Sequence, residues 1–321
     1  MTTKPKSSRR LWPFLAVPAL AVLVAAVIYV GDFSSEDAGV AGAAKEELPG
    51  SQVGESELAD SSLRPDPGEQ HAAAQDQLQA ALDEAVEDYL SEIEDQNLYV
   101  SVAVGDGEFE LGYNGDEQHD TASIVKVEIL IMLLRHYETV EAIPDWVIGE
   151  AERMIKESDN EATNSILFGI LDGHATMREA HELLGLPGTE PHTTERWGLT
   201  QTTAADQLLI LDFALYEGVL SEAQAELARG LMGDLADFQD WGVSAAAEAG
   251  ETVWMKNGWD TRTDLGGEWL VNSVGIIEGE SEEPVSIAVL TGGSASEEAG
   301  IALTEDLARI AREVIDTDPY A

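Results

Sequence analysis

The order of strand-like and helix-like segments most constrains the fold of this chain. Segments with the composition and spacing of strands occur in two places, residues 98–111 and residues 251–291. Most of the sequence between them shows the spacing of amphipathic helices. We therefore expect an α/β fold in which one antiparallel sheet is built from both ends of the folded region, with a helical subdomain inserted.

The individual elements follow from hydrophobic periodicity and from turn residues. The folded part is predicted to start near His71, with a first helix over 72–95 in which leucines and a valine recur at helical spacing. The predicted strands are 98–104, 109–111, 251–256, 268–278 and 285–291. The later predicted helices are 123–137, 146–156, 160–171, 175–184, 203–216, 221–232 and 296–315. Residues 185–202 contain glycine and proline and are predicted to form a loop.

The N-terminal region has a different composition from the rest. Residues 11–30 are apolar or proline and uncharged, which is long enough for a membrane-spanning helix. The basic residues precede this segment, so we expect a cytoplasmic tail over 1–10 and everything after 31 outside the cell membrane. A cleaved signal peptide, leading to secretion, is the alternative, although the first Ala-x-Ala site begins only at Ala41. Residues 31–72 are predicted to be an acidic disordered linker, and 73–321 the folded domain.

The charge of the chain excludes some partners. The sequence has 62 Asp and Glu against 17 Lys and Arg, a net charge of -45, and four of the basic residues precede the apolar segment. A body this acidic repels nucleic acid and anionic lipid surfaces. A salt-rich habitat would screen the self-repulsion, but an ordinary acidic soluble protein has a similar composition. There is no cysteine, which excludes disulfides, thiolate metal sites and a cysteine nucleophile.

Three short motifs follow one another along the chain, and the first is Ser123-Ile-Val-Lys126. Ser123 is predicted to open a helix, and Lys126 then lies on the same helix face. A serine hydroxyl becomes a good nucleophile when a nearby base removes its proton, and a buried lysine can be that base because desolvation lowers its pKa. The alternative interpretation is a capping serine beside a solvated lysine.

The second and third motifs are Ser158-Asp159-Asn160 and Lys256-Asn257-Gly258. The second lies between two predicted helices, where Ser158 would pass a proton to the leaving group and Asn160 would orient a substrate amide and Lys126. Its alternative interpretation is an ordinary turn. The third is predicted to end a strand, where glycine lets a substrate backbone approach, or to form a simple strand-end turn. Together the motifs predict a serine acyl-transfer site in which lysine handles the proton.

The ordered set resembles the class A β-lactamase-like serine hydrolases, within the penicillin-recognising serine enzymes. The resemblance extends over about 75–321. Flanking motifs look like those of an actinobacterial branch of serine hydrolases, and they are Tyr113-Asn114-Gly115, Trp197-Gly198-Leu199-Thr200 and Val271-Asn272-Ser273-Val274-Gly275. The resemblance implies a β-lactamase/transpeptidase-like fold, with a five-stranded antiparallel sheet flanked by helices and a trimmed all-helical subdomain.

The same resemblance implies roles for the matching residues. Ser123 would be the acylated nucleophile and Lys126 its proton acceptor. Ser158 and Lys256 would carry the proton relay and hold a substrate carboxylate, and the backbone N–H groups of Ser123 and Trp259 would form the oxyanion hole. The implied substrate-binding residues are Asn160, Asn257, Gly258 and Trp259. The implied partner is a β-lactam or a cell-wall peptide with an acyl-D-alanyl amide, with no metal or cofactor, and the sequence leaves the oligomeric state open.

Three departures from the family pattern affect the expected function. Asn257 stands where the family usually has threonine or serine, so a hydroxyl that helps bind a carboxylate is lost, although an amide could replace it. Fewer residues than usual separate Ser123 from Ser158 in the sequence. The loop whose glutamate hydrolyses the acyl-enzyme in the family is not recognisable. Glu190 and Glu195 are candidates, or simply exposed loop residues.

These departures predict an extracytoplasmic serine hydrolase that is slow in deacylation. A non-catalytic binding or sensor module on the same fold is the main alternative. An unrelated acidic surface protein with chance motifs is a third possibility.

Overall fold

The computed structural model describes residues 67–94, 97–192, 194, 196–216, 218–262, 266–279 and 283–320. All of them belong to the part of the chain that begins at Leu63. The basic tail, the apolar segment 11–30 and most of the predicted linker lie outside the described residues, so the expected anchor stays a prediction. The end of the predicted linker is wrong, because residues 67–72 already belong to the first helix, which begins at Pro67. Within the described ranges, no helix is both long enough and apolar enough to cross a membrane.

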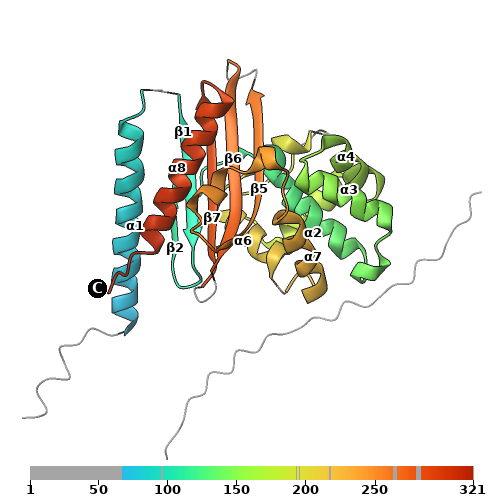
Figure 1. Cartoon of the computed structure of the whole chain (residues 1–321), viewed down its shortest axis with the longest axis horizontal. Helices are drawn as coiled ribbons and strands as arrows, with labels where there is room; N and C mark the ends of the chain where they lie inside the picture. Colours follow the sequence, from blue (N-terminus) through green and yellow to red (C-terminus); the bar gives the residue numbers. More distant parts are fainter. Residues whose placement is uncertain are drawn as a thin grey trace, which may run out of the picture. The chain divides into compact units, whose positions relative to one another are not determined.

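A five-stranded antiparallel sheet forms the centre of the fold (Figure 1). Its strand order is β2-β1-β7-β6-β5. The first strands of the domain therefore pair with the last one, with Ala103 of β1 opposite Ala288 of β7. The sheet is built from both ends of the sequence, as predicted. The strands are β1 (Tyr99–Gly105), β2 (Glu110–Tyr113), β5 (Thr252–Arg262), β6 (Glu268–Glu278) and β7 (Val285–Ser294).

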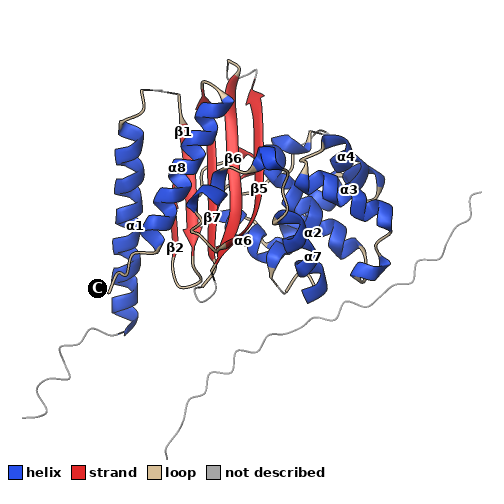
Figure 2. Cartoon of the chain, in the orientation of Figure 1, coloured by secondary structure: helices blue, strands red, loops and turns tan. Residues whose placement is uncertain are grey.

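Two long helices cover one face of the sheet, α1 (Pro67–Ser91) and α8 (Glu297–Ile315) (Figure 2). Leu78 and Leu82 of α1 and Leu307 of α8 pack in one apolar cluster with alternate residues of β1 and β7. The intervening strand residues, such as Ala288, face a second cluster on the helical side. Because both faces of the sheet are covered, its central strands are apolar almost throughout.

In its described residues, the inserted block contains six α-helices and a two-stranded ribbon. Residues 127–134 of its central helix are all buried, and all are apolar except Glu128, which pairs with His181 at 2.8 Å. The helices are α2 (Lys126–His136), α3 (Asp145–Lys156), α4 (Asn160–Gly169), α5 (His174–Leu184), α6 (Ala204–Leu215) and α7 (Glu222–Met232). The ribbon is β3 (His119–Asp120) with β4 (Gln201–Thr202), and short 3-10 turns are η1 (Ala122–Val125), η2 (Val140–Ala142), η3 (Trp197–Leu199), η4 (Asp237–Gln239) and η5 (Gly242–Ala246).

Two predictions about local structure need correction, and both concern motif residues. Ser123 does not open a helix of the α type. It lies in the 3-10 turn η1 after Ala122, whose φ is +46°, and α2 begins only at Lys126. The third motif does not end its strand, because β5 continues to Arg262. The apolar pattern of β5 stops at Lys256 and Asn257, which are polar but buried. Their side chains find hydrogen-bond partners in segments that are distant in the sequence.

Candidate active site

Three segments bring the motif residues together: the turn η1 with the start of α2, the connection between α3 and α4, and the middle of β5. Ser158 lies in that connection with a φ of +55°, a left-handed conformation that is uncommon for a residue with a side chain. The next residue, Asp159, caps α4 by accepting a hydrogen bond from Ala162 N at 2.6 Å. The cap and the left-handed residue together turn the chain toward the two motif lysines.

Lys126 is fully buried at this junction. Its Nζ donates hydrogen bonds to the Ser158 carbonyl oxygen at 2.7 Å, to Asn160 Oδ1 at 2.9 Å and to Ser158 Oγ at 3.1 Å. The indole ring of Trp197 covers the amine, with its centroid 5.0 Å from Nζ. Burial lowers the pKa of Lys126 to about 7, against the opposing effect of the Asp159 charge. Near neutral pH the amine is therefore poised between its charged and neutral forms.

Lys256 approaches the same serine from β5 and is also fully buried. Its Nζ donates to the Asn257 carbonyl oxygen at 2.7 Å, and to Ser158 Oγ and Gln239 Oε1 at 3.1 Å each. Burial, and then the charge of Lys126, lower the pKa of Lys256. The Ser158 hydroxyl oxygen thus lies between two amines, an arrangement that can pass a proton from one side of the site to the other.

Ser123 precedes Lys126 by three residues and is partly exposed. Within the described part of the chain its hydroxyl makes no hydrogen bond, so the oxygen is free to face a ligand. The backbone of η1 touches β5 at Gly258, where an added Cβ would lie 2.7 Å from Ser123 N and 2.8 Å from Ile124 N. Only glycine fits this contact. Trp259 follows directly, so the two N–H groups implied for the oxyanion hole lie on backbones that adjoin at this point.

The comparison with known proteins fits this geometry. A family model described as the β-lactamase enzyme family matches residues 150–315. The chain belongs to the β-lactamase enzyme family. It is a serine hydrolase of the β-lactamase type, as the ordered motifs predicted. Comparison with curated protein sequences gives no match.

Several solved structures have a similar fold, and those described here are all under 25% identical to this chain. A class A β-lactamase from Mycobacterium abscessus has a TM-score of 0.60 and 20% identity, covering 76% of this chain and 100% of its own. A β-lactamase from Burkholderia phymatum has a TM-score of 0.63 and 18% identity, covering 74% and 99%. A mutant of PBP-A, in an acyl-enzyme complex with penicillin G, has a TM-score of 0.61 and 18% identity, covering 74% and 97%. These similarities confirm the predicted fold.

In this β-lactamase family member the Asn257 side chain faces away from the motif lysines. Its Nδ2 donates to the carbonyl oxygens of Gln239 at 2.9 Å and Trp241 at 3.1 Å, and its Oδ1 accepts from Ser273 Oγ at 2.7 Å. Successive strand residues point to opposite faces, so Lys256 and Gly258 share the site face and Asn257 does not. The expectation that its amide replaces the missing hydroxyl at a substrate is therefore wrong.

The remaining candidates differ in position. Asn160 is exposed and orients Lys126, as expected, through its Oδ1. Glu190 is exposed, and its backbone pairs with Gln201 at the edge of the β3–β4 ribbon. Glu195 lies outside the described residues. Sequence reasoning missed Gln239, which binds Lys256 from a segment without helical or strand periodicity, so no local signal marks it.

Proposed function

We propose that this protein acylates Ser123 with a β-lactam or with an acyl-D-alanyl amide of cell-wall peptide. The neutral Lys126 amine takes the hydroxyl proton, and Ser123 Oγ bonds to the carbonyl carbon. The backbone N–H groups of Ser123 and Trp259 stabilise the oxyanion. The C–N bond then breaks, and Ser158 passes the proton held by Lys126 to the leaving nitrogen. Lys256 supports this relay by donating to the Ser158 oxygen.

One observation carries the proposal: Ser158 Oγ accepts hydrogen bonds from two buried lysines, at 3.1 Å from each amine. A solvated lysine would stay charged and useless as a base at neutral pH, whereas burial brings the pKa of Lys126 to about 7. A structural ion pair would instead place a carboxylate on each amine. Among the described residues, every hydrogen-bond acceptor of the two amines is neutral.

We further propose that release of the acyl group is slow. Hydrolysis of an acyl-enzyme needs a base that activates water close to the ester. Trp197 covers the Lys126 amine, and Glu190 is exposed on the ribbon edge. Among the residues that the structure describes, no carboxylate forms a side-chain hydrogen bond or an ion pair with Ser123, Lys126 or Ser158.

Intact-mass spectrometry of the full chain after addition of a penicillin tests both proposals. The wild type should gain the mass of the drug and keep it over time, and Ser123→Ala should gain nothing. Ser91→Ala, an exposed serine at the end of α1, is the matched control and should label like the wild type. Labelling that survives in Ser123→Ala would refute the assignment. Rapid loss of the adduct with consumption of the drug would refute slow release.

A non-catalytic binding module is the second candidate, and the orientation of Asn257 favours it. With that side chain turned into the fold, the site lacks the hydroxyl that helps hold a carboxylate in the family. Calorimetric binding of a wall peptide or a penicillin without any covalent adduct would support this reading over catalysis.

The apolar segment 11–30, with basic residues before it, supports a single-pass anchor that holds the site outside the cell membrane. Fractionation of cells that express the full chain, compared with a chain lacking residues 1–30, tests this location. Recovery of the intact full chain in the soluble fraction would contradict it, and a shortened secreted form would indicate signal cleavage.

A further inference from the structure

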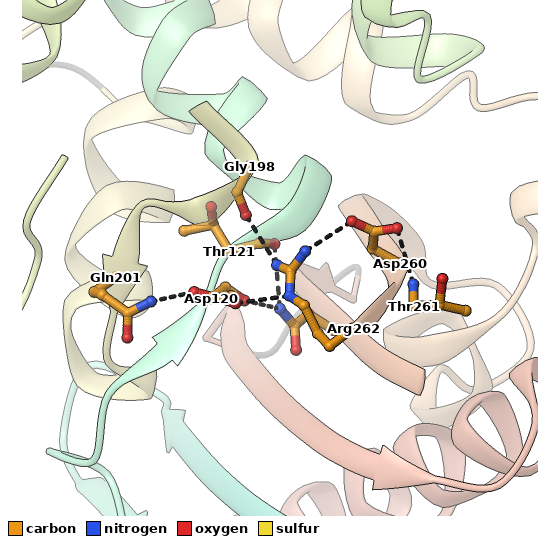
Figure 3. A network of polar contacts seen from close by, with 8 residues as sticks. Asp120, Thr121, Gly198, Gln201, Asp260, Thr261 and Arg262 are labelled. Carbon is orange, nitrogen blue, oxygen red and sulfur yellow. Dashed lines mark hydrogen bonds and ion pairs between the residues drawn. The ribbon is translucent and has the colours of Figure 1, made fainter. Parts of the chain in front are cut away.

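Arg262, the last residue of β5, joins three segments that surround the site (Figure 3). Its Nε forms an ion pair of 2.7 Å with Asp120 that lacks hydrogen-bond geometry. Its other guanidinium nitrogens form an ion pair of 2.7 Å with Asp260 and donate to the Gly198 carbonyl oxygen at 3.3 Å. Only 12% of the side chain is exposed. Asp120 lies in β3, which leads into η1, and Gly198 lies in η3 beside Trp197. Arg262 thus connects its own strand β5 with β3, which leads to Ser123 in η1, and with η3, which carries Trp197 over Lys126.

The Asp120 end of this network is itself fixed. Its carboxylate accepts a hydrogen bond from Gln201 Nε2 across the β3–β4 ribbon. The side-chain Nδ2 of Asn272, in β6, donates hydrogen bonds to the carbonyl oxygens of Asp120, at 2.9 Å, and Thr121, at 3.2 Å. Arg262 and Asn272 therefore hold the approach to Ser123 from two directions, and the position of η1 relative to β5 depends on both.

The backbones of η1 and β5 are in close contact. The contact at Gly258 leaves no room for a single methyl group between the two backbones. Ala122, directly before Ser123, has a positive φ of 46°, a strained conformation for a residue other than glycine. Such strain persists only when surrounding contacts enforce it. The ion pair from Arg262 to Asp120 is one of those contacts, because it acts two residues before Ala122.

We propose that Arg262 is a positioning residue that sets the distance between Ser123 and the backbone of Trp259. This rests on the proposed function, because it assigns Arg262 to the geometry of the acylation step. Binding of a substrate carboxylate by Arg262 is the competing role. The guanidinium already serves two carboxylates and a carbonyl oxygen, so a substrate would have to displace one of them.

Single-turnover kinetics of full-length variants separate the two roles. Arg262→Ala should lower the limiting acylation rate by about 10- to 100-fold with little change in the apparent dissociation constant, because misplacement affects the reacting geometry rather than binding. Arg262→Lys should recover only part of the rate, since an ammonium cannot bridge three partners. Asp120→Asn should resemble Arg262→Ala, and the double variant should be no slower than the worse single one.

Arg309 of α8 provides a matched control. It makes contacts of the same kind, with Asp306 at 2.7 Å, Glu305 at 3.5 Å and the Ala245 carbonyl oxygen at 3.2 Å, but it lies on the far face of the sheet. Arg309→Ala should acylate like the wild type. A raised dissociation constant with an unchanged limiting rate in Arg262→Ala would overturn the proposal in favour of carboxylate binding.

Hydrogen exchange of the peptide over residues 119–125 tests positioning without any chemistry. Exchange should rise in Arg262→Ala and Asp120→Asn, and stay unchanged in Arg309→Ala. If the wild type fails to acylate but this pattern appears, the proposed function is wrong and the positioning role stands. If acylation occurs and neither rate nor exchange responds to Arg262→Ala, the positioning role is wrong and the proposed function stands.

Discussion

The rate of acylation should depend on pH through Lys126. Its pKa falls from 10.5 to about 7, which corresponds to roughly 5 kcal/mol in favour of the neutral amine. At pH 7 the neutral fraction rises from about 1 in 3,000 to about one half. If the neutral amine is the base, the limiting rate should rise with pH, reach half its maximum near pH 7, and fall about tenfold for each unit below that.

Quenched single-turnover acylation, followed by intact mass between pH 5.5 and 9 at constant ionic strength, measures this profile. Asp159→Asn supplies the matched test, because asparagine keeps the helix cap while the carboxylate that raises the pKa of Lys126 is removed. Its midpoint should move to lower pH. A rate that is flat or falls as pH rises through 7 would refute Lys126 as the base, and a midpoint near 10 would refute its desolvation.

Three further predictions concern the backbone and the buried polar groups. Gly258→Ala should lower the acylation rate at least about tenfold, because the added methyl pushes η1 away from β5. Gly149→Ala in α3 is the control, since nothing lies within 4 Å of its added methyl. It should raise the free energy of unfolding by about 0.5–1 kcal/mol in denaturant titration. Ser158→Gly and Ser158→Ala should lose acylation alike, but the glycine variant should be more stable by about 1 kcal/mol because it accepts the positive φ; equal stability would contradict this. Asn257→Ala should lower the free energy of unfolding by roughly 2–4 kcal/mol, since three buried groups lose their partner, and a loss below 1 kcal/mol would argue against the observed network.

Much of the fold follows from local pattern because burial is periodic in both helices and strands. The strands at both ends and the helices between them lie within a few residues of their predicted bounds, apart from the strand that continues to Arg262. Three of the motif residues also meet, since Lys126, Ser158 and Lys256 form one hydrogen-bonded group. Each motif marks a turn or a strand, and the fold brings those elements to one place.

The parts that sequence reasoning missed depend on contacts between distant segments. Nothing local to Asn257 shows that Gln239 and Ser273 will satisfy its amide. Likewise, the link between Arg262 and Asp120 joins residues with no common pattern. The positive φ of Ala122 and Ser158 is also invisible, because glycine is the usual signal for that conformation.

Burial lowers the pKa of Lys126, and it also shields the Lys126 amine from the negative charges on the surface of the chain. A net charge of -45 would raise the pKa of an exposed lysine, yet the acceptors around Lys126 are neutral oxygens beneath an indole ring. Salt shortens the Debye length from about 10 Å at 0.1 M to about 3 Å at 1 M, which screens exposed carboxylates far more than buried hydrogen bonds. Raising the salt concentration should therefore speed the association of an anionic penicillin while the pH midpoint of acylation moves little. A midpoint that falls by a full unit in 1 M salt would mean that surface carboxylates, rather than desolvation, set the charge state of this lysine.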